Sequence, residues 1–247
     1  MEKEVKKLSV VVPCFCEGKT IFENLKKIEQ YLRNNFSDYE LIAVNDGSSD
    51  NTSEELSRAA SQIPKILVID NKINMGKGKV VRDGVLKSAG DVIMFLDADL
   101  AMPIEDVGKF IVEIKNGYAL AIASRFVPGL KVMKPVLWYR KIMEKIFRII
   151  RMIIINNYTV KDTQCGFKVF SRKAALEIFP LTKINRFAFD AEIIFIAQKR
   201  GYRIKELPIV LQNPATSSIR IFRDSFNMFC DLFKIRLNSF LGKYKQS

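Results

Sequence analysis

The sequence predicts an α/β fold in which a mostly parallel central sheet carries helices on both of its faces. Short apolar runs alternate with segments of helical periodicity along the first half of the chain, which is the pattern of a parallel sheet. Several of these runs end in loops that are dense in polar residues. The 247 residues are 48% hydrophobic, enough for one sizeable core, so we expect a single domain over residues 1–247.

Five short, continuous apolar runs in the first half are predicted to be buried strands. They are residues 8–12, 40–44, 65–69, 92–96 and 119–123. Between them, apolar residues recur every three to four positions, as on one face of a helix. The predicted helices are residues 19–36, 53–63, 74–88 and 103–116.

The second half continues with shorter elements. A strand is predicted at residues 167–170, with Ser171 as the N-cap of a helix that ends near residue 179. A further helix ends near Arg200, and residues 202–207 alternate like an edge strand. Residues 128–135 are predicted to form a mobile loop that could close over the site.

Two amphipathic helices are expected at residues 136–155 and 221–241. In the first, Arg140, Lys141 and four more charged residues fall on one face, while Trp138 and bulky aliphatic side chains fill the rest. This composition is typical of a helix that lies in a membrane interface, and the alternative is a core helix with a solvated basic face. The second helix is rich in Phe and is either another interfacial element or the packing partner of the first.

Composition excludes several classes of protein and site. The chain has no histidine, which removes His-ligated metals and nucleophiles activated by histidine. Its four cysteines show no Cys-x-x-Cys pattern, so neither a disulfide scaffold nor a zinc site is expected. Neither a signal peptide nor an apolar run of about 20 residues is visible, so the expected membrane attachment is peripheral.

The net charge of +13 is unevenly distributed. Residues 1–130 hold 17 Lys and Arg against 19 Asp and Glu, whereas residues 131–247 hold 23 against 8. The positive excess of the second half indicates an anionic partner, such as a membrane surface, a phosphorylated ligand or nucleic acid. That half has no RRM, KH or zinc pattern, so nucleic acid is not expected as a partner.

Asp97 and Asp99 stand one residue apart, directly after the predicted strand 92–96. Ligands of open α/β sheets bind beyond the carboxyl ends of strands, and residues i and i+2 of a strand point the same way. Two carboxylates in that place suit Mg²⁺ or Mn²⁺ that substrate phosphates also hold. A solvated turn is the alternative for an isolated Asp-x-Asp, and the neighbouring loops favour the metal site.

Three more loops follow predicted strands and offer polar groups. Asp46 can accept a hydrogen bond from the imide N–H of uracil or from guanine, with an Asx turn as the alternative. Gly76 and Lys77 open a helix and can approach a base or a diphosphate, although glycines before helices are common. Phe15 offers an edge to the base and Glu17 an acceptor for the ribose, with simple packing as the alternative.

Taken together and in order, these motifs resemble glycosyltransferase family 2 of the GT-A fold. They are Val-Val-Pro-x-x-x-Glu from Val11, Asn-Asp-Gly-Ser-Ser-Asp-Asn-Thr from Asn45, Asn-x-Gly-Lys-Gly from Asn74, and Asp-Ala-Asp from Asp97. The later Asp-Thr-Gln-Cys-Gly-Phe-Lys of residues 162–168 is similar to the branch that glycosylates polyprenyl phosphates, nearest to its dolichyl-phosphate β-glucosyltransferases. The resemblance spans about residues 8–235.

The resemblance implies a nucleotide-sugar-binding half at residues 1–130 and an acceptor-binding half at residues 131–241. In that family Asp46 contacts the base, and Asp97 and Asp99 bracket the diphosphate and the metal. The full set predicted to bind the nucleotide sugar is Pro13, Phe15, Glu17, Asp46, Gly76, Lys77, Asp97, Ala98 and Asp99. Cys16 departs from the usual Asn, and Ala101 replaces a Gln of mannosyl relatives, which fits the glucosyl branch better.

Cations are expected to bind the acceptor phosphate. Arg125 follows a strand, where a guanidinium can bind a phosphate through two hydrogen bonds; a salt-bridged surface arginine is the alternative. Lys168 is another candidate, and the resemblance adds Arg220. The resemblance also places Asp190 and Glu192 near the acceptor. The alternative is that these acids stabilise the N-terminus of a helix through its dipole. The predicted catalytic set is Asp97, Asp99, Arg125 and Asp190.

The predicted function is inverting transfer of a hexose, with glucose from UDP-glucose favoured, to dolichyl or another polyprenyl phosphate at the cytoplasmic face of a membrane. A phosphate monoester has a second pKa of about 6 and is largely ionised near neutral pH, so no catalytic histidine is needed. The alternatives are a GDP-mannose donor, a glycan acceptor, and a non-enzymatic basic protein that binds a membrane or RNA.

Overall fold

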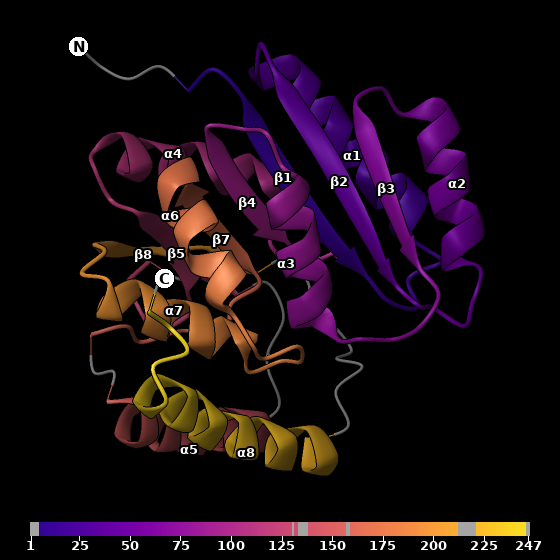
Figure 1. The fold of residues 1–247 in the computed structure, drawn as a ribbon. Coiled ribbons are helices and arrows are strands. Elements are labelled where there is room, and N and C mark those ends of the chain that lie inside the picture. Colours follow the sequence, from indigo (N-terminus) through magenta and orange to yellow (C-terminus); the bar gives the residue numbers. More distant parts are fainter. Residues whose placement is uncertain (1–4, 130, 133–137, 157–158, 212–220, 246–247) are drawn as a thin grey trace.

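The computed structural model describes residues 5–129, 131–132, 138–156, 159–211 and 221–245. Its centre is a seven-stranded sheet in the order β3-β2-β1-β4-β7-β5-β8 (Figure 1). The strands are β1 (Leu8–Cys14), β2 (Tyr39–Asp46), β3 (Ile66–Asn71), β4 (Val92–Leu96), β5 (Leu120–Ser124), β7 (Phe167–Ser171) and β8 (Ile204–Pro208). All pairings in this sheet are parallel except the two that β7 makes, so the predicted mostly parallel sheet is confirmed.

Helices connect the strands close to where the apolar periodicity predicts them. They are α1 (Ile21–Asn35), α2 (Thr52–Gln62), α3 (Lys77–Lys87), α4 (Val107–Lys115), α5 (Trp138–Ile155), α6 (Arg172–Ile178), α7 (Phe189–Lys199) and α8 (Ile221–Phe240). Short 3₁₀ turns, η1 (Ile104–Asp106) and η2 (Phe179–Leu181), precede α4 and follow α6. The predicted N-cap is confirmed, because the Ser171 hydroxyl accepts a hydrogen bond from the backbone N–H of Ala174.

The sheet separates two hydrophobic layers. On one face, buried side chains of α1, α2 and α4 pack against β1, β2 and β4. On the other face, α3, α6 and α7 cover the sheet, and Leu232 and Ile235 of α8 join the same cluster. The helices therefore cover both faces, as the alternation of strand and helix predicts.

Strand β7 lies between β4 and β5 and runs antiparallel to both. Its register pairs Phe167 with Leu96 at the end of β4. The predicted strand at residues 167–170 is confirmed, but its direction was not predictable from the apolar run alone. This direction places the amino end of β7 beside the carboxyl end of β4, which Asp97 directly follows.

A small second sheet occupies part of the predicted loop 128–135. Within that loop, β6 (Lys131–Val132) pairs in parallel with β9 (Val210–Leu211). Residues 131–132 of the predicted loop are therefore paired as a short strand with a distant segment, and the predicted closure over the site stays a prediction. Residues 130 and 133–135 lie outside the described part of the chain.

The two amphipathic helices, α5 and α8, lie side by side at one end of the molecule (Figure 1). Helix α8 also contacts α7, which connects this pair of helices to the sheet. Among the residues that the structure describes, no helix is both long and apolar enough to cross a membrane.

Candidate active site

The two aspartates of the Asp-Ala-Asp motif occupy a tight turn at the end of β4. The backbone N–H of Leu100 donates to the Asp97 carbonyl at 3.2 Å, which closes the turn. The Asp99 side chain accepts a hydrogen bond from the backbone N–H of Ala101 at 2.9 Å. The carbonyl of Ala98 accepts from the Asn24 amide at 2.9 Å, so α1 supports the same turn. Asp97 and Asp99 are both half-buried and not fully solvated.

Lys77 reaches the same place from the first turn of α3. Its ammonium lies 2.6 Å from Oδ1 of Asp97. Burial disfavours the charged form of Lys77, but the carboxylates of Asp97, Asp190 and Asp99 outweigh that cost and raise the lysine pKa. Burial, together with the charge of Asp97, raises the pKa of Asp99. The structure thus brings together three residues that the sequence predicted to lie in the site.

The carboxylates of this turn fit a divalent cation that a ligand also holds. Oδ1 of Asp97 is buried, and the ammonium of Lys77, at 2.6 Å, is its partner within the described part of the chain. No group of three or more acidic or sulfur ligands in the described residues could hold a metal ion by itself. The described carboxylates of this turn would therefore supply part of a coordination sphere for Mg²⁺ or Mn²⁺, and phosphate oxygens would complete it.

The carboxylate of Asp46 holds the loop before α3 through hydrogen bonds that its motif did not reveal. One carboxylate oxygen accepts from the backbone N–H of Met75 at 2.7 Å. The other accepts from the N–H of Gly76 at 3.0 Å and from the Asn74 amide at 2.9 Å. Asp46 is buried, so its carboxylate fixes the loop that leads into α3 and Lys77. Its predicted contact with a base stays a prediction.

The polar loop after β2 holds the loop after β1. The hydroxyl of Ser48 accepts from the N–H of Cys16, and that of Thr52 accepts from the N–H of Glu17, both at 2.9 Å. These bonds leave the ring of Phe15 exposed on the surface of the loop. Burial and the neighbouring charge of Asp99 raise the pKa of Glu17, which places this carboxyl beside the aspartate turn.

Gly76 and Gly78 are required by close packing between two segments of the chain. A Cβ atom on Gly76 would lie 2.4 Å from the carbonyl oxygen of Asn185. A Cβ atom on Gly78 would lie 2.5 Å from Cβ of Phe189 and 2.6 Å from the carbonyl oxygen of Ile184. The segment before α7 therefore packs directly on the loop that carries Lys77, a reason for these glycines that sequence reasoning missed.

Arg125 follows β5 and is oriented by a buried acid. Its Nε and Nη2 donate to the carboxylate of Asp162 at 2.7 and 3.0 Å, and its backbone N–H donates to the same group at 3.0 Å. Burial disfavours the charged form of Asp162, but Arg125 outweighs it and lowers the pKa of that carboxyl. The guanidinium keeps part of its surface open, so it is a salt-bridged arginine with a fixed orientation.

Lys168 and Asp190 form a buried ion pair. The side chain of Lys168 is 0% exposed, and its ammonium lies 2.5 Å from Asp190 and 2.6 Å from the carbonyl oxygen of Cys165. The sequence predicts that Lys168 binds the acceptor phosphate, and this geometry does not support that role because no solvent reaches the ammonium. Asp190, predicted to be catalytic, is likewise buried against Lys168.

Glu192 faces away from the aspartate turn. Its carboxylate accepts from the backbone N–H groups of Lys183 and Ile184 and from the hydroxyl of Tyr244. The other acid at the start of α7, Asp190, is one of the carboxylates that raise the pKa of Lys77. Glu192 instead connects the segment before α7 to the end of the chain after α8. Arg220, the third predicted acceptor cation, lies outside the described residues.

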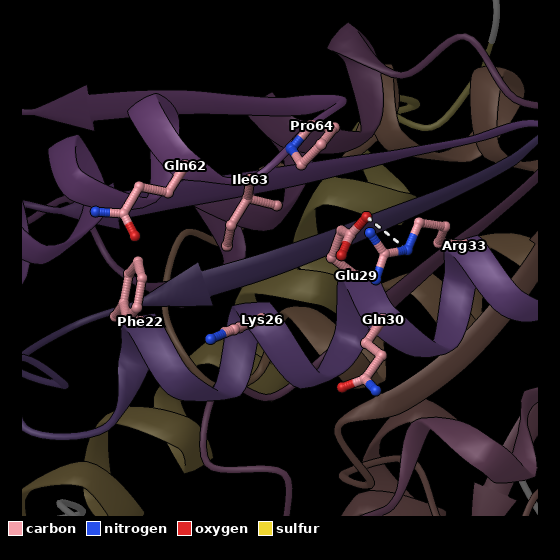
Figure 2. A pocket seen from close by; sticks show the side chains of 8 residues that line it. All are labelled: Phe22, Lys26, Glu29, Gln30, Arg33, Gln62, Ile63 and Pro64. Carbon is pink, nitrogen blue, oxygen red and sulfur yellow. Dashed lines mark ion pairs between the residues drawn. The ribbon is translucent and has the colours of Figure 1, made fainter.

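A shallow groove on the surface is separate from this cluster. It has a volume of about 240 Å³ and runs between α1 and the end of α2 (Figure 2). Its walls come from Phe22, Lys26, Glu29, Gln30, Arg33, Gln62, Ile63 and Pro64. None of the predicted site residues lines it, so the groove is not the candidate active site.

Comparison with known proteins gives one family and one fold. Residues 9–179 match the model of glycosyl transferase family 2. A dolichyl-phosphate beta-glucosyltransferase of Trichomonas vaginalis is 35% identical over 92% of this chain and 70% of its own length. The enzymes of the same name from Saccharomyces cerevisiae and Homo sapiens are 32% and 31% identical, over 97% and 99% of this chain and 77% and 79% of theirs.

The solved structure of glucosyl-3-phosphoglycerate synthase from Mycobacterium tuberculosis has the same fold. In its complex with Mn²⁺, UDP and glucosyl-3-phosphoglycerate, it superposes with a TM-score of 0.67 at 16% identity. The superposition covers 94% of this chain and 79% of that one. At this level of identity the likeness concerns the fold of the chain and not its substrate.

Proposed function

Because this chain belongs to glycosyl transferase family 2, we propose that it transfers glucose from UDP-glucose to dolichyl phosphate. The proposal is supported by relatives that bear the name dolichyl-phosphate beta-glucosyltransferase and align over nearly the whole chain. The single observation that carries the chemistry is the convergence of Asp97, Asp99 and Lys77 at the carboxyl end of β4.

Asp97 and Asp99 would hold Mg²⁺ or Mn²⁺ together with the diphosphate of the donor, and the Mn²⁺ and UDP bound to the M. tuberculosis synthase support this assignment. When bound, the cation offsets the negative charge that builds on the leaving diphosphate. Lys77 supplies a further positive charge from the start of α3, where backbone N–H groups also favour anions. Phe15 and Asp46 are the proposed contacts of the uracil base, and Glu17 that of the ribose.

The acceptor needs to be positioned more than it needs to be activated. An ionised oxygen of the lipid phosphate attacks the anomeric carbon while the bond from that carbon to the UDP oxygen breaks. The electron pair leaves with UDP, and the attack from the opposite side inverts the configuration. No proton has to be removed from the acceptor near neutral pH, which agrees with a chain that contains no histidine.

The decisive assay offers the purified protein labelled UDP-glucose, dolichyl phosphate and Mn²⁺ or Mg²⁺. We expect label in the lipid extract, loss of that signal with EDTA, and UDP as the other product. A parallel arm offers labelled GDP-mannose. Transfer from GDP-mannose but not from UDP-glucose would overturn the proposed donor, and transfer to a glycan but not to the lipid would overturn the proposed acceptor.

Replacement of Arg125 by glutamine is expected to weaken use of the acceptor more than binding of the donor. We propose that the guanidinium, held by Asp162, binds the acceptor phosphate. A hydrogen bond to a charged group contributes about 1.5–3 kcal/mol, so the KM for dolichyl phosphate should rise by about 10- to 100-fold. The UDP dissociation constant should stay within about twofold of wild type.

Arg58→Gln is the matched control, because Arg58 lies on α2 in an exposed ion pair with Glu55. This variant should leave both constants unchanged. Equal losses of acceptor use and UDP binding in Arg125→Gln would argue against the proposed role of Arg125.

We also propose that α5 and α8 rest on an anionic membrane surface. Large apolar side chains are exposed along the described parts of both helices and directly after α8, and we call this set the interfacial face. Its members are Ile146, Ile149, Ile153, Phe226, Phe229, Phe233, Leu237, Phe240 and Leu241. The exposed cations Lys145, Arg236 and Lys243 lie on or next to the same two helices. A lipid acceptor and the excess charge of the second half make a bilayer the partner that fits this face.

A triple change of Phe226, Phe233 and Phe240 to serine is expected to release the protein from liposomes. Burial of a Phe side chain contributes about 1.5–3 kcal/mol, so partitioning onto vesicles with anionic lipid should fall by at least about 100-fold. The measurement is flotation with vesicles of phosphatidylcholine and phosphatidylserine. Turnover of a short, water-soluble polyprenyl phosphate should be retained, because none of the three residues belongs to the proposed active site.

The matched control changes Leu67, Leu86 and Val112 to serine, since these side chains are also large, apolar and exposed but lie elsewhere. It should float like the wild type. If the control lost flotation as completely as the triple Phe variant, nonspecific hydrophobic adsorption and not the interfacial face would explain the binding.

A further inference from the structure

We propose that Gly166 is a positioning residue for the carboxylate of Asp97, and that the reaction requires a residue without a side chain at position 166. The inference rests on the proposed metal site and adds to it a residue that would contact neither substrate nor metal. Gly166 comes from the loop before β7, far along the chain from the Asp-Ala-Asp motif.

The antiparallel register places the two residues opposite each other. Leu96 pairs with Phe167 at the end of β4, so Asp97 and Gly166 are the next facing pair. The ladder continues to this position, because the backbone N–H of Asp97 donates to the carbonyl oxygen of Gly166 at 3.1 Å. The backbone of Asp97 is therefore held to the residue that precedes β7.

The carboxylate of Asp97 occupies the space that a side chain on Gly166 would need. A Cβ atom built on Gly166 would lie 2.0 Å from Oδ2, 2.3 Å from Cγ and 2.5 Å from Oδ1 of Asp97. All three distances are far below a van der Waals contact. On the other side, the Lys77 ammonium lies 2.6 Å from Oδ1. The carboxylate is thus enclosed between the bare backbone of Gly166 and a cation.

The backbone conformation at Gly166 does not itself require glycine. Positive φ angles occur at Gly47, Gly76 and four other glycines of the described residues, but not at Gly166. An alanine there would meet the end of one short side chain, and the nearest obstacle is not backbone. By contrast, an alanine at Gly78 would meet the ring-bearing Cβ of Phe189 and a carbonyl oxygen. Gly166→Ala is therefore expected to displace the Asp97 carboxylate and to leave the fold intact.

A displaced carboxylate no longer meets the requirements of a small divalent cation. Metal–oxygen distances must be met within about 0.2 Å. Changes to residues that only orient a metal ligand typically weaken metal binding by about 10- to 100-fold. Because Gly166 positions Asp97 without contacting the metal, the same range is expected for Gly166→Ala.

The test measures Mn²⁺ binding by electron paramagnetic resonance in the presence of saturating UDP, without turnover. Wild type, Gly166→Ala and Gly108→Ala are compared, together with their melting temperatures. Gly108 lies in α4 with nothing near its Cβ position, so Gly108→Ala should bind Mn²⁺ like wild type. Gly166→Ala should raise the Mn²⁺ dissociation constant by about 10- to 100-fold, with a change in melting temperature of no more than about 2 °C.

Mn²⁺ binding by Gly166→Ala within twofold of wild type would overturn the proposal. If this variant melts at a markedly lower temperature, Gly166→Ala is made again in the Asp97→Ala background. The carboxylate that obstructs the new side chain is absent there, so the decrease in melting temperature should disappear. A decrease in melting temperature that persists in this background would overturn the proposal as well. Failure of wild type itself to bind Mn²⁺ with UDP would instead remove the proposed metal site, and the two failures are thereby distinguished.

Discussion

Replacing Asp97 by asparagine is expected to lower glucosyl transfer by at least about 10³-fold. The amide keeps the size of the side chain but removes the charge that faces Lys77 and, in our proposal, the divalent cation. Stabilisation of a leaving group by a metal contributes several kcal/mol, and about 4 kcal/mol corresponds to this factor. The measurement is the initial rate of lipid glucosylation at saturating UDP-glucose and dolichyl phosphate.

The matched control for this variant is Asp38→Asn, because Asp38 is exposed and pairs with Lys65 on the surface. Its rate should equal that of wild type, since surface ion pairs contribute little. Melting temperatures of both variants show whether the fold is intact. If Asp97→Asn kept more than a tenth of the wild-type rate, the assignment of Asp97 to the metal would be wrong.

Replacing Lys168 by methionine is expected to lower the free energy of unfolding by about 3–5 kcal/mol. The ammonium is buried against Asp190, and its removal leaves that carboxylate inside the protein without its paired cation. Methionine fills a similar volume, so loss of the charge and not a cavity is tested. Urea unfolding followed by circular dichroism gives the change in stability.

Lys72→Met supplies the comparison, because Lys72 also lies 2.6 Å from a carboxylate, that of Asp70, but its side chain is 84% exposed. Its free energy of unfolding should change by less than about 0.5 kcal/mol. A loss in Lys168→Met as small as that in Lys72→Met would contradict the buried pair. Partial recovery of stability in Lys168→Met/Asp190→Leu would support it, since both charges are then removed.

Those features of the fold that depend on local patterns were predictable from the sequence. Residues 92–96 are apolar without interruption and coincide with β4, and the other strands of the first half lie within two residues of their apolar runs. The polar loops follow those strands in a parallel sheet, so Asp97, Asp99 and Lys77 could be expected at one edge. The proximity of these three residues could therefore be predicted without information on long-range contacts.

The remaining features depend on contacts that no local pattern encodes. The run 167–170 indicates a strand but not its direction, and only the antiparallel pairing with β4 sets Gly166 against Asp97. The same holds for Lys168, which on an alternating strand can face solvent or the core, and whose partner Asp190 lies 22 residues away. The sequence indicates that the loop with Gly76 and Lys77 can approach a base or a diphosphate, but it does not reveal that the segment before α7 packs on Gly76 and Gly78.

The most direct test of the central claim is a crystal structure with UDP and Mn²⁺, with anomalous scattering recorded at the manganese edge. Our account predicts one manganese peak at the end of β4, within coordination distance of Asp97 or Asp99 and of diphosphate oxygens. A diphosphate bound in this place without manganese, or manganese bound away from both aspartates, would contradict it.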